Sequence, residues 1–196
     1  MQLDLDLYKL ILKKELSQER YLHSIGVMET AINLARKHGV SEYKAAIAGL
    51  LHDCAKDIPE EEQLKLALEF GILLDEITCF ERVLLHGPVG AKLAEIKFGI
   101  KDKEILKAIE IHTTGDENMT LLDKIIYIAD YIEPGRDFPG VEDIRDKTYE
   151  DLDEGVLMGL NSTIVYVLKK NSLLHPRTIA ARNMLLKNRR NKRGEK

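Results

Sequence analysis

Apolar residues recur every three or four positions along most of this chain, the spacing that places them on one face of an α-helix. The repeat is clearest between Leu5 and Leu16 and again between Tyr21 and Ala35. No segment shows the strict alternation of apolar and polar residues that is typical of a half-buried β-strand. The pattern therefore predicts an all-α protein built as a single helical bundle.

Residues that start and stop helices divide this pattern into elements. Ser17 and Ser41 are suited to cap helix N-termini, and Gly39 is suited to end the helix between them. Pro59 fits the first turn of a further helix that Gly71 closes. The remaining helices are expected at about 87–97, 102–113, 119–132, 149–170 and 177–190.

Composition narrows the class of protein. The 196 residues are 44% hydrophobic and 32% charged, which is typical of one globular domain, and a net charge of −4 gives no overall reason to expect DNA binding. The two cysteines, Cys54 and Cys79, form no disulfide framework, so a reducing compartment is favoured. The first residues lack the pattern of a secretion signal, and no apolar run approaches the roughly 18 residues that would span a membrane. These features predict a cytoplasmic protein with no membrane partner.

The chain ends in a basic segment, residues 187–196, with six basic residues and one acidic residue. Such a segment can contact RNA electrostatically, but it holds no aromatic residue for stacking on bases. More often it is a solvated end. We therefore expect a folded domain over residues 1–186, followed by a disordered tail.

The pair His52-Asp53 carries the most chemical information. It ends the apolar run 48–51, where a carboxylate and an imidazole are costly to bury unless a group such as a metal ion compensates both. Successive helical residues point about 100° apart, so the two side chains can straddle an ion lying beside the helix end. Four further residues of these types stand beside apolar residues elsewhere in the chain: His23, His86, His112 and Asp130.

Taken singly, each of these residues is more often a hydrogen-bonded structural side chain than a metal ligand. Their joint occurrence is more specific, because several separate helices each deliver one His or Asp from an apolar face. Asp130 in particular lies in a segment that is apolar nearly all round, so its carboxylate needs a partner. The sequence therefore predicts a divalent metal site with several ligands. Mixed nitrogen and oxygen ligands suit Fe, Mn, Co or Zn better than Mg or Ca.

The order His23, His52-Asp53, Asp130 resembles that of the HD superfamily of metal-dependent phosphohydrolases. The closer resemblance is to the YqeK family, HD-domain hydrolases that cut diadenosine tetraphosphate symmetrically. The segments that carry it are 20–24, 49–56, 85–91, 111–115, 126–136 and 174–178.

The resemblance implies a single HD-domain helical bundle whose metal, most often iron, is bound by the residues matching His23, His52, Asp53 and Asp130. It leaves two roles open for His86 and His112, which either hold a second metal or contact the phosphate that is cut. Catalysis would then use metal-activated water, and the implied catalytic residues are His52, Asp53, Lys56, His86 and His112. A homodimer is also compatible with the resemblance.

Contacts to a nucleotide are implied less specifically. Arg136 follows a turn and could place its guanidinium over phosphates, or it could be a surface arginine beside Asp137. Thr113 could bind phosphate or simply end a helix, and residues 174–178 could bind an anion at a helix N-terminus or form only a turn and cap. The full set of implied substrate contacts is Arg20, His23, Asp53, His86, His112, Thr113, Arg136, Leu174, His175, Arg177 and Thr178.

Three functions compete at this point. The first is an enzyme, a metal-dependent hydrolase that cuts diadenosine tetraphosphate into two ADP. The second is an HD-domain hydrolase of another nucleotide, such as a nucleoside triphosphate, a cyclic nucleotide or an alarmone. The third is a nucleotide-sensing or RNA-associated module whose metal is only structural. The intact ligands together with Lys56 and Arg136 disfavour the third, and only the closer family resemblance separates the first two.

Overall fold

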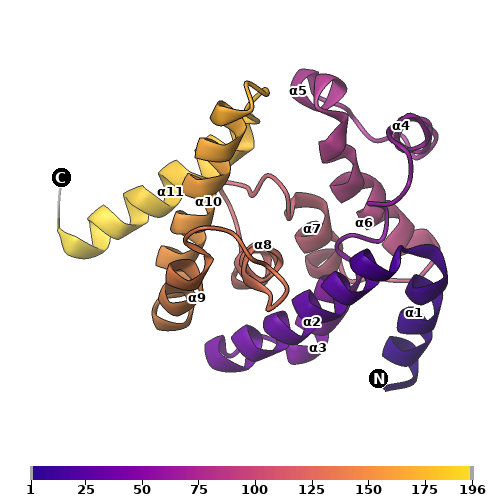
Figure 1. Ribbon diagram of the computed structural model, residues 1–196, viewed down its shortest axis with the longest axis horizontal. Helices are drawn as coiled ribbons and strands as arrows, with labels where there is room; N and C mark the ends of the chain where they lie inside the picture. The colour runs from indigo at the N-terminus through magenta and orange to yellow at the C-terminus, as the bar shows by residue number, and fades with distance from the viewer. Residues whose placement is uncertain (1, 195–196) are drawn as a thin grey trace.

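The computed structural model describes the fold of residues 2–194, which is helical throughout with no β-strand among those residues (Figure 1). The helices are α1 (Gln2–Glu15), α2 (Gln18–His38), α3 (Glu42–Leu51), α4 (Glu60–Glu69), α5 (Glu76–Phe80), α6 (His86–Ile96), α7 (Lys103–Ile111), α8 (Leu121–Ile132), α9 (Val141–Glu150), α10 (Leu152–Lys169) and α11 (Pro176–Arg193), with one 3-10 turn, η1 (Arg82–Leu85). The predicted all-α class is confirmed.

Helix α8 lies at the centre of the bundle. It packs against α2, α3, α7 and α10, and most of its side chains are buried, including Ile125, Ile126 and Ile128. Figure 1 shows α8 between α10 on one side and α2 with α7 on the other. A helix that is apolar nearly all round is stable only when neighbours cover it on every side. Asp130, in the last turn of α8, is therefore brought against the neighbouring helices by the packing of the whole helix.

Helices α2 and α3 form the closest pair in the bundle. A Cβ atom added to Gly49 would lie only 3.0 Å from the Cα atom of Met28, so the two backbones approach to a distance that only glycine allows. The expected caps are also present: Ser17 accepts from the backbone N–H of Arg20, and Ser41 caps α3 in the same way. This packing sets the end of α3, where His52 stands, against the middle of α2.

Three expectations about the elements need correction. The structure contains α5, η1 and α9, which the pattern did not predict because these short segments show too few apolar repeats. The helix expected at 149–170 is divided at Asp151, whose extended backbone (φ −146°) lets its side chain cap α10. Helix α11 continues to Arg193, three residues beyond its expected end, and Arg189 pairs with Glu154 of α10 at 2.9 Å. Residues 195 and 196 lie outside the described residues.

Across the described part of the chain, the structure contains no helix with both the length and the apolar character needed to cross a membrane.

The close approach of α2 and α3 can be tested with one methyl group. Gly49→Ala should lower the free energy of unfolding by about 1–3 kcal/mol, because the added methyl must push α3 away from backbone atoms of Met28. Gly90→Ala is the matched control in α6: its Cβ would meet its nearest neighbours at 3.5 Å, an ordinary contact, so its effect should stay within about 1 kcal/mol. Urea denaturation of both variants measures the difference, and equal stabilities would contradict the packing argument.

Candidate metal centre

The six residues expected to form the site meet at one point of the interior. They come from the middle of α2, the end of α3, the start of α6, the end of α7 and the inner face of α8: His23, His52, Asp53, His86, His112 and Asp130. Neighbouring rings stand edge to face along a row, with centroids 5.0 to 5.2 Å apart from His23 through His52 and His112 to His86. The prediction that these residues lie together is therefore met by the geometry.

Three of the histidines are fixed by the same local contact. Each places Nδ1 beside the backbone carbonyl oxygen three residues earlier: His52 beside Gly49, His112 beside Ile109 and His86 beside Val83. The distances are 2.8 Å for His52 and 2.7 Å for His112. A carbonyl oxygen can only accept, so in each ring Nδ1 carries the proton and donates it. The other nitrogen, Nε2, is left as an acceptor that points into the site.

The fourth histidine is fixed by a side chain. His23 Nδ1 lies 3.1 Å from Glu133 Oε1, so it donates to this carboxylate and its Nε2 also faces the site. Glu133 is buried, and its second oxygen accepts from the backbone N–H of Gly135 at 2.6 Å. A Cβ on Gly26 would lie 2.5 Å from Glu133, so the absence of a side chain at that position makes room for it. A histidine held by a carboxylate in this way is the usual support of a metal ligand.

Glu133 was not predicted as a site residue. Nothing in its residue type distinguishes it from the other glutamates of the chain. The available indication was its position one turn after Asp130, immediately before Pro134 and Gly135.

Around Asp53 Oδ2, the acceptor atoms are arranged as ligands of a single ion. His23 Nε2 lies 3.0 Å from Asp130 Oδ1 and 3.8 Å from Asp53 Oδ2. His52 Nε2 is 3.5 Å from Asp53 Oδ2 and 3.8 Å from Asp130 Oδ1. His23, His52 and Asp130 each offer one atom within 4.8 Å of the others, which suits metal bonds of about 2.0–2.2 Å to a common ion.

The Nε2 atom of His52, which forms no hydrogen bond, shows whether these residues suit a metal ion. Its Nε2 is completely buried and has no hydrogen-bond partner among the described residues. A buried polar atom without a partner costs about 1–3 kcal/mol, so a group that accepts its lone pair is expected there. The nitrogen and carboxylate donors present fit a divalent metal ion.

The other oxygen of Asp53 faces a second group. Asp53 Oδ1 lies 3.3 Å from His86 Nε2 and 3.5 Å from His112 Nε2, and these two nitrogens are 3.2 Å apart. Both nitrogens are acceptors, and lone pairs at this distance repel each other unless a proton or cation lies nearby. One such cation is the ammonium of Lys56, whose Nζ is 3.3 Å from His86 Nε2.

Two arginines complete the positive surroundings of the centre. Arg20 Nη1 donates to Asp53 Oδ2 at 2.6 Å. The Arg136 guanidinium donates two hydrogen bonds to Asp130, one to a carboxylate oxygen and one to the backbone carbonyl oxygen. The Arg136 guanidinium also lies 3.4 Å from His23 Nε2. Both arginines therefore lie beside the candidate ligands, and their expected contact with a nucleotide stays a prediction. Guanidinium groups here are well placed to bind phosphate oxygens.

The pKa shifts of Asp53, Asp130 and His86 favour the protonation states of metal ligands. At His52, burial is outweighed by Asp53 and then Asp130, which raise the pKa of the ring; a cation bound there would take the place of that proton. Burial opposes the charge of Asp53, but His52, His112 and His86 outweigh it and hold the pKa of the Asp53 carboxyl well below its usual range. For Asp130, burial is likewise outweighed, first by the neighbouring ring of His23 and then by His52 and Arg136, and its pKa is far below normal. Burial and then repulsion from His112 lower the pKa of His86 to about 3. Ionised carboxylates and a neutral imidazole are the forms that bind a metal.

A cavity opens on the centre from the side of α8 and α10. Its volume is about 520 Å³, and we call it the tyrosine-lined cavity because Tyr127, Tyr131 and Tyr166 form its wall together with Phe138. Lys56, His112, Thr113, Asp130 and Arg136 line its inner end. Its size is within the usual range for a small-molecule site.

The predicted contacts at 174–178 lie further away, at the N-terminus of α11. Of these residues, His175 and Arg177 line a small pocket of about 60 Å³ that shares only Thr113 with the tyrosine-lined cavity. The side chain of His175 is engaged there: its Nδ1 accepts from the backbone N–H of Arg177, and its Nε2 donates to Asp75 at 3.1 Å. In His175 the proton is therefore on Nε2, whereas in the four site histidines it is on Nδ1. His175 acts as a helix cap, one of the two roles left open by the sequence.

Helices that deliver a His, a His-Asp pair and a distant Asp to one point define the HD-domain class of metal-dependent phosphohydrolases. The HD domain family matches residues 20–135. The protein named symmetrical bis(5'-nucleosyl)-tetraphosphatase in Halalkalibacterium halodurans is 43% identical over 90% of this chain and 94% of its own length. The protein of the same name in Bacillus subtilis is 42% identical over 89% of this chain and 93% of its own length.

A solved structure from Clostridium acetobutylicum, described as a predicted HD superfamily hydrolase involved in NAD metabolism, is 46% identical and matches with a TM-score of 0.91 over 93% of this chain and 97% of that one. The chain therefore belongs to the HD domain family and, within it, to the YqeK family.

The support given by Glu133 can be measured through metal binding. Glu133→Gln should weaken divalent metal binding by about 10–100-fold, because the neutral amide no longer polarises the Nδ1–H of His23. Glu142→Gln, a change of the same kind at an exposed position, is the control. Competition for the metal against a chelator gives both affinities. Unchanged affinity in Glu133→Gln would show that Glu133 does not hold the ligand.

Proposed function

We propose that this protein hydrolyses diadenosine tetraphosphate symmetrically, giving two molecules of ADP. The observation that carries the proposal is the complete His and Asp ligand set in a chain 43% identical, over nearly its whole length, to a protein named for this activity. The arginines and Lys56 beside the ligands fit a substrate with several phosphates.

The metal would be held by His23, His52, Asp130 and the Oδ2 atom of Asp53. When bound, a divalent ion at this position supplies two kinds of chemistry, by acidifying a coordinated water and by neutralising phosphoryl oxygens. We propose iron as the natural metal, since the nitrogen and oxygen donors suit it and the family resemblance favours it. A second ion would lie between His86, His112 and Asp53 Oδ1, where two acceptor nitrogens face each other.

The residues of the chain would then act on the phosphates and on one nucleoside. Lys56, Arg20 and Arg136 would neutralise charge that builds up on the phosphate chain as the bond breaks. One nucleoside would occupy the tyrosine-lined cavity, where aromatic rings can stack on its base. We propose that the α11 N-terminus, with Leu174, Arg177 and Thr178, contacts this nucleoside from beyond Thr113.

The cytoplasmic location and the homodimer stay predictions. The unpaired state of Cys54 and Cys79 supports a cytoplasmic location, because free thiols persist in reducing compartments. The homodimer rests on the family resemblance alone.

A metal ligand and a phosphate-binding residue should affect different properties of the enzyme when they are replaced. Asp53→Ala should remove the metal and lower turnover more than about 100-fold, because Asp53 faces both groups of histidines. Arg136→Ala should retain the metal and raise KM for the nucleotide. Metal analysis of the purified variants, with circular dichroism as a check on folding, separates the two roles. Full metal content with normal turnover in Asp53→Ala would refute the proposed centre.

The position of the cut is tested by the products. With diadenosine tetraphosphate, chromatography should show ADP as the only nucleotide product, and in ¹⁸O-water one ADP of each pair should carry the label on its terminal phosphate. ATP with AMP would rule out symmetrical cleavage. A panel that adds nucleoside triphosphates, cyclic nucleotides and alarmones decides against the second candidate, hydrolysis of another nucleotide, if diadenosine tetraphosphate has the highest kcat/KM.

A further inference from the structure

We propose that a groove along α2, the α2 groove, binds the second nucleoside of the substrate; this assignment rests on the proposed function. Hydrolysis adds one water across the central P–O–P linkage of diadenosine tetraphosphate: one P–O bond breaks, one forms, and two ADP result. Each half carries a nucleoside, and the two lie on opposite sides of the bond that breaks. The tyrosine-lined cavity extends to one side of the centre only, so a second subsite is needed.

Two hollows of similar size meet at Arg136. The α2 groove has a volume of about 460 Å³ and the tyrosine-lined cavity about 520 Å³, and Arg136 lines both. His23 lines the groove and Asp130 lines the cavity. Because His23 Nε2 and Asp130 Oδ1 are only 3.0 Å apart, the two hollows are lined by neighbouring members of the same candidate ligand set. A chain of phosphates over the centre can therefore continue into both.

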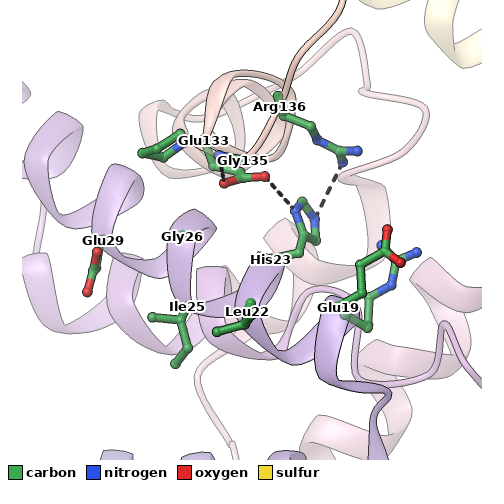
Figure 2. Close-up of a pocket in the computed structure, with 11 residues that line it drawn as sticks. Glu19, Leu22, His23, Ile25, Gly26, Glu29, Glu133, Gly135 and Arg136 are labelled. Atoms are coloured by element: carbon green, nitrogen blue, oxygen red, sulfur yellow. Dashed lines mark hydrogen bonds and ion pairs between the residues drawn. The ribbon is translucent and has the colours of Figure 1, made fainter.

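One end of the α2 groove is suited to phosphate. Figure 2 shows the groove running along α2 from Glu19 past His23 to Glu29, with Arg136 over His23. Arg20 lines the same end, and its buried Nε donates no hydrogen bond within the described part of the chain. Two guanidinium groups at the end nearest the metal ligands match the charge of a diphosphate.

The rest of the groove is suited to a nucleoside. Leu22, Ile25 and Pro134 give it an apolar wall, and Leu22 is 58% exposed although it is a large apolar side chain. Glu29 forms no hydrogen bond or ion pair with the other described residues, so its carboxylate is free to accept from a ribose hydroxyl or a base amino group. It lies six residues after His23, about 9 Å along the helix axis. An apolar wall with few polar groups is the usual construction of a small-molecule subsite.

The test compares two substrates that differ by one nucleoside. Diadenosine tetraphosphate carries two, whereas adenosine 5'-tetraphosphate carries one and would be cut by one water into ADP and pyrophosphate. The single nucleoside can take the tyrosine-lined cavity, so the α2 groove matters only for the first substrate. The metal-loaded full chain is used throughout. Where adenosine 5'-tetraphosphate turns over too slowly, its inhibition constant against the first substrate serves for the comparison.

Leu22→Glu places a negative charge in the groove at an exposed position. We expect its kcat/KM for diadenosine tetraphosphate to fall at least about tenfold more than for adenosine 5'-tetraphosphate, because a charged, hydrated carboxylate on the apolar wall of the groove disfavours the second nucleoside, which only the first substrate carries. Leu68→Glu, at a leucine of α4 that is 67% exposed and does not line the groove, should leave both values unchanged. Tyr166→Ala should lower both values together, since either substrate needs the tyrosine-lined cavity.

Each outcome has one meaning. A selective loss in Leu22→Glu supports the α2 groove as the second subsite. Equal losses with both substrates, or no loss at all, would overturn it while leaving symmetrical hydrolysis intact. A wild-type protein that forms no ADP from diadenosine tetraphosphate overturns the proposed function itself, before any variant is compared.

Discussion

The centre depends on where four histidines place the proton of the imidazole ring. In His52, His86 and His112 the proton is donated to a backbone carbonyl within the same turn, and in His23 it is donated to Glu133. Every Nε2 is therefore an acceptor, and all four converge on the ionised carboxylates. These nitrogens and carboxylate oxygens are all acceptors, and a cation among them relieves the repulsion that Arg20, Lys56 and Arg136 offset from outside. The backbone of the helices thus prepares a site for positive charge before any ion arrives.

The packing of the bundle and the chemistry of the centre share the same atoms. Gly49 has no side chain, which lets α3 approach α2, and its carbonyl oxygen holds the ring of His52. The central helix α8 supplies Asp130, and the turn that ends it supplies Glu133. Few positions near the centre can change without affecting both fold and ligand geometry. Arg136, which is held by Asp130 and lines both hollows, connects this centre to the surface.

Most of the fold, and the His and Asp residues that meet at the centre, could be predicted from the sequence, because helical periodicity, serine caps and the order of His and Asp are local or additive features. Glu133 could not be predicted, since its role arises from contact with His23 across the bundle. The two roles of His175 could not be separated for a similar reason: its contact with Asp75, 100 residues away, sets its protonation pattern. The division at Asp151 is a local cap that apolar periodicity does not reveal, whereas α11 packs on α10 through the pair Arg189–Glu154.

The contact between His23 and Glu133 joins residues 110 positions apart. Closing a loop of this length costs conformational entropy that many other contacts must offset, so this contact depends on the packing of the helices between its two partners. During synthesis, α2, α3, α6 and α7 emerge from the ribosome before α8. A chain at that stage has all four histidines and Asp53 but neither Asp130 nor Glu133. Complete metal coordination therefore becomes available only once α8 has joined the bundle, which ties metal capture to completion of the fold.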